Sequence, residues 1–184
     1  MSMRHLLLVP ALLAASAFVG PVAVSDGWTV RADIINREGQ RIGAAHLRAA
    51  TGGVLIQVHV SQLAPGTHAI YIHAVGKCDA PDFASAGAQF DPYGLQGGKP
   101  AGDSPNFDVD ASGDATMSVL SRGLILARGR PNSVFHDAGA ALVIHENAYD
   151  YKAHPAGKPG RRLACGVIFI AGSGSKSSHP YLKQ

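Results

Sequence analysis

The stretch from residue 66 to residue 92 holds the densest group of side chains able to bind a metal or move a proton. It begins with an alternation of polar and apolar residues over 67–73, which is typical of a β-strand. The residues suited to chemistry within it are His68, Tyr71, His73, Cys78 and Gln89. Because they lie on a predicted strand or soon after it, we expect a functional site at a strand end.

The N-terminal segment predicts export from the cytoplasm. Residues 1–25 combine Arg4 with an apolar run over 6–13 and with small residues that allow cleavage after Ala17 or Ser25. The apolar run is too short to cross a bilayer. We therefore expect a signal peptide and a periplasmic or secreted protein without membrane contact after cleavage. The alternative is an uncleaved membrane anchor.

The charge of the chain excludes one class of partner. The formal net charge is +3 and the pI is near 9.0, and removal of Arg4 with the signal leaves +2. No stripe of Arg and Lys with interleaved aromatic residues is present, so the sequence does not predict nucleic-acid binding.

Cys78 and Cys165 are the two cysteines of the chain. In an exported protein two cysteines predict one disulfide bond. It would stabilise the fold by about 3–5 kcal/mol in the chain-entropy description. The alternative is a pair of thiols that bind a metal.

The rest of the chain predicts an all-β fold. Short alternating or apolar segments separated by turn residues indicate about eight antiparallel strands, the first four forming a meander. The expected strands cover residues 28–34, 41–50, 54–60, 67–73, 106–110, 115–120, 141–145 and 163–171. Long Gly- and Pro-containing loops separate the later strands, and residues 172–184 form a Gly/Ser/Lys-rich tail that we expect to be disordered. This pattern favours a β-sandwich or a flattened Greek-key barrel over residues 26–171.

Several motifs make the chain resemble the exported bacterial copper/zinc superoxide dismutases over nearly the whole mature domain. These motifs are Pro65-Gly66-Thr67-His68, Ile72-His73-Ala74-Val75-Gly76-Lys77-Cys78, Ser85-Ala86-Gly87, Ala101-Gly102-Asp103, Leu142-Val143-Ile144-His145 and Arg162-Leu163-Ala164-Cys165-Gly166-Val167-Ile168. The resemblance implies a Greek-key β-sandwich, a zinc-type loop at 74–104, an electrostatic-type loop at 146–162 and a disulfide between Cys78 and Cys165.

The resemblance also shows where this chain departs from the copper ligands of that family. The family binds copper through four histidines, one of which also bridges to zinc. At the matching positions this chain retains His73 and His145 but has Tyr71 in the first position and Gln89 in the bridging position. Two of the four expected copper ligands are therefore absent.

At the zinc-ligand positions this chain differs from the family even more than at the copper positions. The two other zinc histidines of the family match Gly97 and Pro100, and Asp103 is the remaining zinc-type ligand. The aspartate that orients metal histidines in the family is matched by Tyr149, beside Asp150. A glutamine and one carboxylate cannot supply the four ligands of an ordinary zinc site, so we do not expect zinc.

Three states of the site remain open from the sequence. Tyr71 and Tyr149 could fill the vacated space in a metal-free protein. Alternatively, His73 and His145 hold copper weakly, with Tyr71 as a candidate third ligand. The third alternative is Fe(III) or haem held by tyrosine and histidine.

The expected activity is reduced. Gln89 cannot carry the proton that the bridging imidazole of the family exchanges, so the sequence predicts weak or no superoxide dismutation. Arg162 matches the family arginine that guides superoxide, and Lys152, Lys158 and Arg161 could add a positive rim that attracts superoxide or another small anion. The alternative is a solvated basic loop.

Two functions are therefore compatible with the sequence. One is a superoxide-dismutase-like protein with an altered copper site. The other is a non-catalytic binding or structural module descended from the enzyme. Either form is compatible with a homodimer or with a protein partner.

Overall fold

The computed structural model describes residues 29–94, 100–150 and 159–171. Nine strands and one short 3₁₀ segment form the described part. They are β1 (Thr29–Asn36), β2 (Arg41–Ala50), β3 (Gly53–Val60), β4 (Gly66–His68), β5 (Ile70–His73), η1 (Ala84–Ala86), β6 (Phe107–Val109), β7 (Ala115–Ser121), β8 (Ala141–His145) and β9 (Arg162–Ala171). The predicted all-β fold is confirmed, with one strand more than expected in the described residues.

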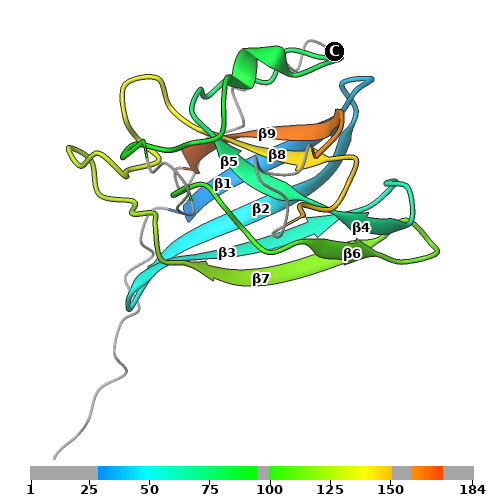
Figure 1. Ribbon diagram of the computed structural model, residues 1–184, viewed down its shortest axis with the longest axis horizontal. Helices are drawn as coiled ribbons and strands as arrows, with labels where there is room; N and C mark the ends of the chain where they lie inside the picture. The colour runs from blue at the N-terminus through cyan, green and yellow to red at the C-terminus, as the bar shows by residue number, and fades with distance from the viewer. Residues whose placement is uncertain (1–28, 95–99, 151–158, 172–184) are drawn as a thin grey trace, which may run out of the picture.

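Seven strands form one antiparallel sheet in the order β5-β8-β9-β1-β2-β3-β7, and β4 pairs with β6 in a second, two-stranded sheet. The large sheet curls, so that β5, β8 and β9 lie above β2, β3 and β7 (Figure 1). Alternate residues of these strands point into the space between the two halves, as the period-2 pattern of the sequence requires. The core residues there include Ile34, Ile56, Ile72 and Ile144, all essentially inaccessible to solvent.

The predicted strand over 67–73 is wrong as a single element, because the chain changes sheets at Ala69. The N–H of Ala69 donates to the Asn147 carbonyl at 3.0 Å, and its own carbonyl accepts from the N–H of His145 at 2.8 Å. The backbone groups of Ala69 are thus bonded to the last residue of β8 and to a residue just after it. Residues before it pair with β6 and residues after it pair with β8.

The predicted four-strand meander is also wrong in its last member. β1, β2 and β3 are consecutive neighbours, but the strand beside β3 is β7. The chain leaves β3 for the opposite half of the curled sheet and returns only after β6. This long-range return is the Greek-key feature that the sequence predicted for the fold as a whole.

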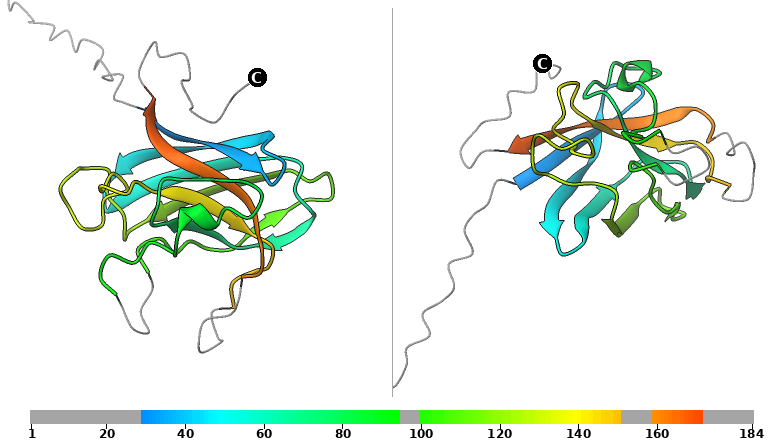
Figure 2. Two further views of the ribbon diagram at one scale, coloured as in Figure 1. Left: turned by 90° about the horizontal axis from the view of Figure 1, so that it is seen from above. Right: turned by 60° about the vertical axis from the view of Figure 1, so that its left-hand side comes forward.

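Residues 74–90, which follow β5, lie over the outer face of β5, β8 and β9 and are called the covering segment here. Figure 2 shows this segment from two further directions. A second apolar cluster, here called the outer cluster, lies beneath it. Its buried members are Cys78, Phe83, Ala86, Ala141, Val143 and Cys165. Cys78 and Cys165 form a disulfide with a Cα–Cα distance of 5.7 Å, which ties this segment to β9.

Several predictions fall outside the described residues. These are the signal peptide at 1–25, the tail at 172–184 and the residues Gly97, Lys152 and Lys158. Within the described residues, no helix has the length and apolar character needed to cross a membrane.

Candidate functional site

The candidate site lies on the outer face of the paired strands β5 and β8. Tyr71 pairs with Val143, and His73 pairs with Ala141. Since directly paired residues share a face, Tyr71, His73 and His145 all point away from the core residues Ile70, Ile72 and Ile144. The sheet register therefore brings together two histidines that lie 72 residues apart in the sequence, which we call the histidine pair.

The two imidazoles of the histidine pair are in direct contact. The Nε2 atom of His73 lies 3.2 Å from Nε2 of His145, and the rings are nearly parallel, with centroids 5.4 Å apart. The Nδ1 atom of His73 lies 3.0 Å from the carbonyl oxygen of Gly87. A carbonyl only accepts, so Nδ1 carries the proton and Nε2 of His73 presents its lone pair towards His145.

His145 can therefore donate its Nε2 proton to His73. Its other nitrogen, Nδ1, is buried and has no hydrogen-bond partner of ordinary geometry in residues 29–94, 100–150 and 159–171. A metal cation bound by both Nε2 atoms would displace this proton. The Nε2 lone pairs of His73 and His145 would then both face the cation. The arrangement thus has the chemistry of a two-nitrogen metal-binding site.

Both histidines are held neutral by burial. The exposed fractions of His73 and His145 are 3% and 5%. Desolvation lowers the pKa of each from 6.5 to about 4. These values already include the positive charge of Arg162, which lowers both pKa values, and that of His73, which lowers the pKa of His145, while backbone groups of Gly87 and Gly160 act in the opposite direction for His73 and His145 respectively. Both imidazoles are therefore neutral across the neutral pH range, and a metal cation bound by both Nε2 atoms would have to displace one proton, that on Nε2 of His145.

This burial predicts acid-sensitive folding of the metal-free chain. Each folded-state pKa lies below the unfolded value, so the stabilisation is fully present above pH 6.5 and is lost as the pH falls towards 4. We expect urea unfolding with a chelator present to give a free energy of unfolding about 2–4 kcal/mol lower at about pH 5 than at pH 7. A His73→Gln/His145→Gln variant should lose most of this difference. An equal pH dependence in that variant would contradict the assignment.

Two tyrosine rings pack around the histidine pair. The Tyr71 ring lies edge-on to His145, with centroids 5.2 Å apart, and Tyr149 lies edge-on to Tyr71 at 5.9 Å. Tyr71 is buried and Tyr149 is half-buried. The sequence predicted that these two residues would stand at altered positions of one site, and the structure places them next to each other.

The Gly87 carbonyl connects the histidine pair to Arg162. This carbonyl accepts from His73 Nδ1 and also from Nη2 of Arg162 at 2.7 Å, while Nη1 of Arg162 donates to the Phe83 carbonyl at 2.5 Å. The resemblance implies that Arg162 guides superoxide. The geometry shows that its guanidinium anchors the segment of residues 83–87 over the site.

Gln89 occupies the position that faces His73 from the covering segment. Its backbone forms an antiparallel bridge with His73, so the two side chains share a face. The neighbouring Gly102 lies so close to β5 that a Cβ there would be 2.3 Å from the Ile72 carbonyl oxygen. This approach lets the end of the zinc-type loop lie along the edge of β5.

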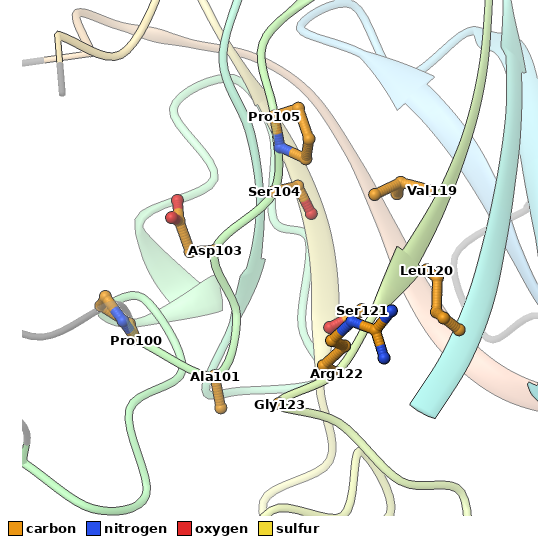
Figure 3. Close-up of a pocket in the computed structure, with 10 residues that line it drawn as sticks. All are labelled: Pro100, Ala101, Asp103, Ser104, Pro105, Val119, Leu120, Ser121, Arg122 and Gly123. Atoms are coloured by element: carbon orange, nitrogen blue, oxygen red, sulfur yellow. The ribbon is translucent and has the colours of Figure 1, made fainter. Parts of the chain in front are cut away.

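Of the zinc-type positions, the structure describes Gln89, Pro100 and Asp103. Within the described residues, no group of three or more His, Cys, Asp and Glu side chains is arranged to hold a metal. Pro100 and Asp103 instead line a cavity of about 350 Å³ (Figure 3). The other residues lining it are Ala101, Ser104, Pro105, Val119, Leu120, Ser121, Arg122 and Gly123, and the Asp103 carboxylate points away from Arg122 (Figure 3).

The remaining sequence candidates lie apart from the histidine pair. His68 is buried, with its ring nitrogens 2.9 Å from the carbonyl oxygens of His145 and Ala64. His46 and His59 are exposed on the outer face of the large sheet. Arg161 forms a salt bridge with Glu146, so its charge is largely compensated and contributes little to a positive rim.

Sequence reasoning missed Gly87 and Asn106 as contributors to the site. Gly87 acts through its carbonyl, and its φ of +73° is a conformation that glycine adopts readily. The Ser85-Ala86-Gly87 motif was the available signal. Asn106 acts through contacts with residue 149, and nothing in the sequence indicates this pairing across 43 positions.

Comparisons with known proteins agree with this fold. A family model described as copper/zinc superoxide dismutase matches residues 42–168. "Superoxide dismutase [Cu-Zn] 1" of Aquifex aeolicus is 42% identical over 153 residues, covering 79% of this chain and 90% of the relative. "Superoxide dismutase-like protein YojM" of Bacillus subtilis is 32% identical over 143 residues, covering 73% of each chain.

Solved structures give the same assignment. The crystal structure of a SOD-like protein from Bacillus subtilis aligns with a TM-score of 0.71 at 31% identity, covering 76% of this chain and 97% of that one. Cu/Zn superoxide dismutase from Brucella abortus aligns with a TM-score of 0.61 at 25% identity, covering 77% and 99%. With a matching family model, relatives of this identity and the same sandwich fold, the chain belongs to the copper/zinc superoxide dismutase family.

Proposed function

We propose that this chain is an exported superoxide-dismutase-like protein whose altered site binds one copper ion through His73 and His145, without zinc and with weak or no dismutation. The family depends on copper and zinc, acts on superoxide and often forms dimers. The observation that carries the proposal is the 3.2 Å contact between the two Nε2 atoms.

The donor set fits copper in low coordination. The Nε2 atoms of His73 and His145 face each other at 3.2 Å, so both could bind one ion. Imidazole nitrogens are good ligands for copper. Tyr71 is near enough to be a candidate third ligand, but its phenol needs a bound cation to ionise at neutral pH. A bound copper ion would supply one-electron redox chemistry.

The residues do not fit the zinc of the family. Asp103 is the remaining zinc-type ligand, Gln89 replaces the bridging histidine, and Pro100 cannot coordinate through its side chain. A structural zinc ion needs about four ligands. We therefore propose that copper, and not zinc, is the metal of this chain, and that Fe(III) or haem would need ligands beyond this pair.

Arg162 supports a role for small anions. Its guanidinium is half-buried, and its charge adds to the larger effect of burial in lowering the pKa values of His73 and His145. Superoxide or another small anion would be attracted by the same charge. Arg162 would thus combine anion attraction with anchoring of the covering segment.

Copper uptake by the purified full chain tests the proposal. We expect about one copper per chain for the wild type and none for His73→Ala/His145→Ala, measured by elemental analysis after removal of loose metal. The matched control is His46→Ala/His59→Ala, which removes two exposed histidines and should retain the copper. Equal uptake by the two double variants would show that the histidine pair is not the site.

A non-catalytic, metal-free module is the second candidate. The observation in its favour is the packing of Tyr71 and Tyr149 against neutral, buried histidines. This candidate predicts a melting temperature that does not change with chelator or with added copper. A clear copper-dependent rise in melting temperature, absent from His73→Ala/His145→Ala, would exclude it.

A further inference from the structure

Asn106 makes two hydrogen bonds to the backbone of a single residue, Tyr149. Its Nδ2 donates to the Tyr149 carbonyl at 3.0 Å, and its Oδ1 accepts from the Tyr149 N–H at 2.8 Å. The two bonds together fix the amide orientation, because only this orientation gives both contacts a donor and an acceptor. Asn106 therefore attaches the chain just after β8 to the start of β6.

This attachment fixes the backbone position from which the Tyr149 ring reaches Tyr71. The ring meets Tyr71 edge-on, and Tyr71 meets His145 edge-on. Tyr149 is half-buried, whereas Tyr71 and the histidine pair are almost completely buried. Tyr149 is thus the most exposed of these rings, and it contacts the histidine pair through Tyr71.

We propose that Asn106 is a positioning residue that holds Tyr149 over Tyr71 and so shields the histidine pair from small reactants. The role of the histidine pair in copper binding rests on the proposed function. The shielding itself is a property of the metal-free chain and can be measured without copper. A shielded pair exposes its copper to few exogenous ligands, which deepens the expectation of weak dismutation.

The size of the effect follows from the two hydrogen bonds. Two bonds of ordinary net strength shift an equilibrium between a shielded and an open arrangement by about tenfold or more. A reactant that needs the open arrangement then reacts at a rate proportional to the population of that arrangement. Loss of the Asn106 amide should raise that reactivity by about tenfold.

Diethyl pyrocarbonate, which acylates neutral imidazole, is a suitable probe because the histidine pair is neutral above pH 5. We expect Asn106→Ala and Tyr149→Ala to raise the labelling rate of His73 and His145 about tenfold in the metal-free full chain, as read by peptide mass spectrometry. Exposed His46 and His59 give the internal reference and should react at unchanged rates.

Two further variants separate shielding from general loosening. Tyr149→Phe keeps the ring and should label at the wild-type rate. Asn132→Ala removes one side-chain hydrogen bond, to the Gly123 carbonyl, and should leave the histidine pair protected. Wild-type labelling in Asn106→Ala, or equal acceleration in Asn132→Ala, would overturn the proposal.

Copper-loaded protein gives a second readout. Azide binding to the Cu(II) form, followed by absorbance, should tighten about tenfold in Asn106→Ala and stay unchanged in Tyr149→Phe. If the wild type takes up no copper but the labelling rates change as expected, the proposed function fails and the shielding stands. If copper binds and neither the labelling nor the azide affinity changes, only the shielding fails.

Discussion

A chain carrying Tyr71→His and Gln89→His is expected to bind Cu(II) roughly 10²–10⁴-fold more tightly than the wild type. Loss of a residue that merely orients a metal ligand costs about 10–100-fold in affinity, and a direct ligand contributes at least as much. Both new imidazoles would lie on the face that already carries His73, because residue 71 is two positions before it and residue 89 is bridged to it.

Competition with a chromophoric chelator measures this gain. The matched control is Tyr71→Phe/Gln89→Leu, which changes the same two positions without adding a nitrogen donor and should not gain affinity. Each single histidine variant should show part of the gain. An affinity of the double histidine variant equal to that of the control would show that the covering segment holds residue 89 away from the pair.

Dismutation by the same variant is a separate question. The double histidine variant would still lack the two zinc histidines, since Gly97 and Pro100 remain. The expected gain in copper affinity is therefore larger than the expected gain in activity. Comparing the gain in copper affinity with the gain in activity separates the loss of copper binding from the loss of the zinc histidines.

Most strands were predictable because they depend on local patterns. The alternation in β2 and β3 and the apolar run of β8 are properties of neighbouring residues, and their bounds agree with the predicted ranges to within one residue. The break at Ala69 was not predictable. It depends on hydrogen bonds to residues 145 and 147, far along the chain, whereas the local alternation continues through it.

The candidate site was likewise only partly predictable from the sequence. His73 and His145 could be found from their residue type and from the motifs around them. The contacts that orient them could not, because the Gly87 carbonyl and the Asn106 amide act through backbone groups and across long sequence separations. Tyr71 illustrates the limit, since its type suggested a ligand, while its ring packs edge-on between His145 and Tyr149.

Removal of the disulfide is expected to lower both stability and copper binding. Cys78 and Cys165 enclose 87 positions of sequence. Closing a loop of this length restricts the unfolded chain enough to stabilise the fold by about 4–5 kcal/mol in the chain-entropy description. Cys78→Ala/Cys165→Ala should therefore unfold at a temperature roughly 10–15 °C lower, measured by calorimetry.

The same variant tests how the site depends on the covering segment. The disulfide anchors residue 78, and residues 83 and 87 of the same segment carry the carbonyls that bind Arg162 and His73. If these carbonyls orient the histidine pair, copper affinity measured well below the melting temperature should fall together with stability. A destabilised variant that keeps wild-type copper affinity would show that β5 and β8 alone fix the pair, and that the segment over them contributes stability without orienting the ligands.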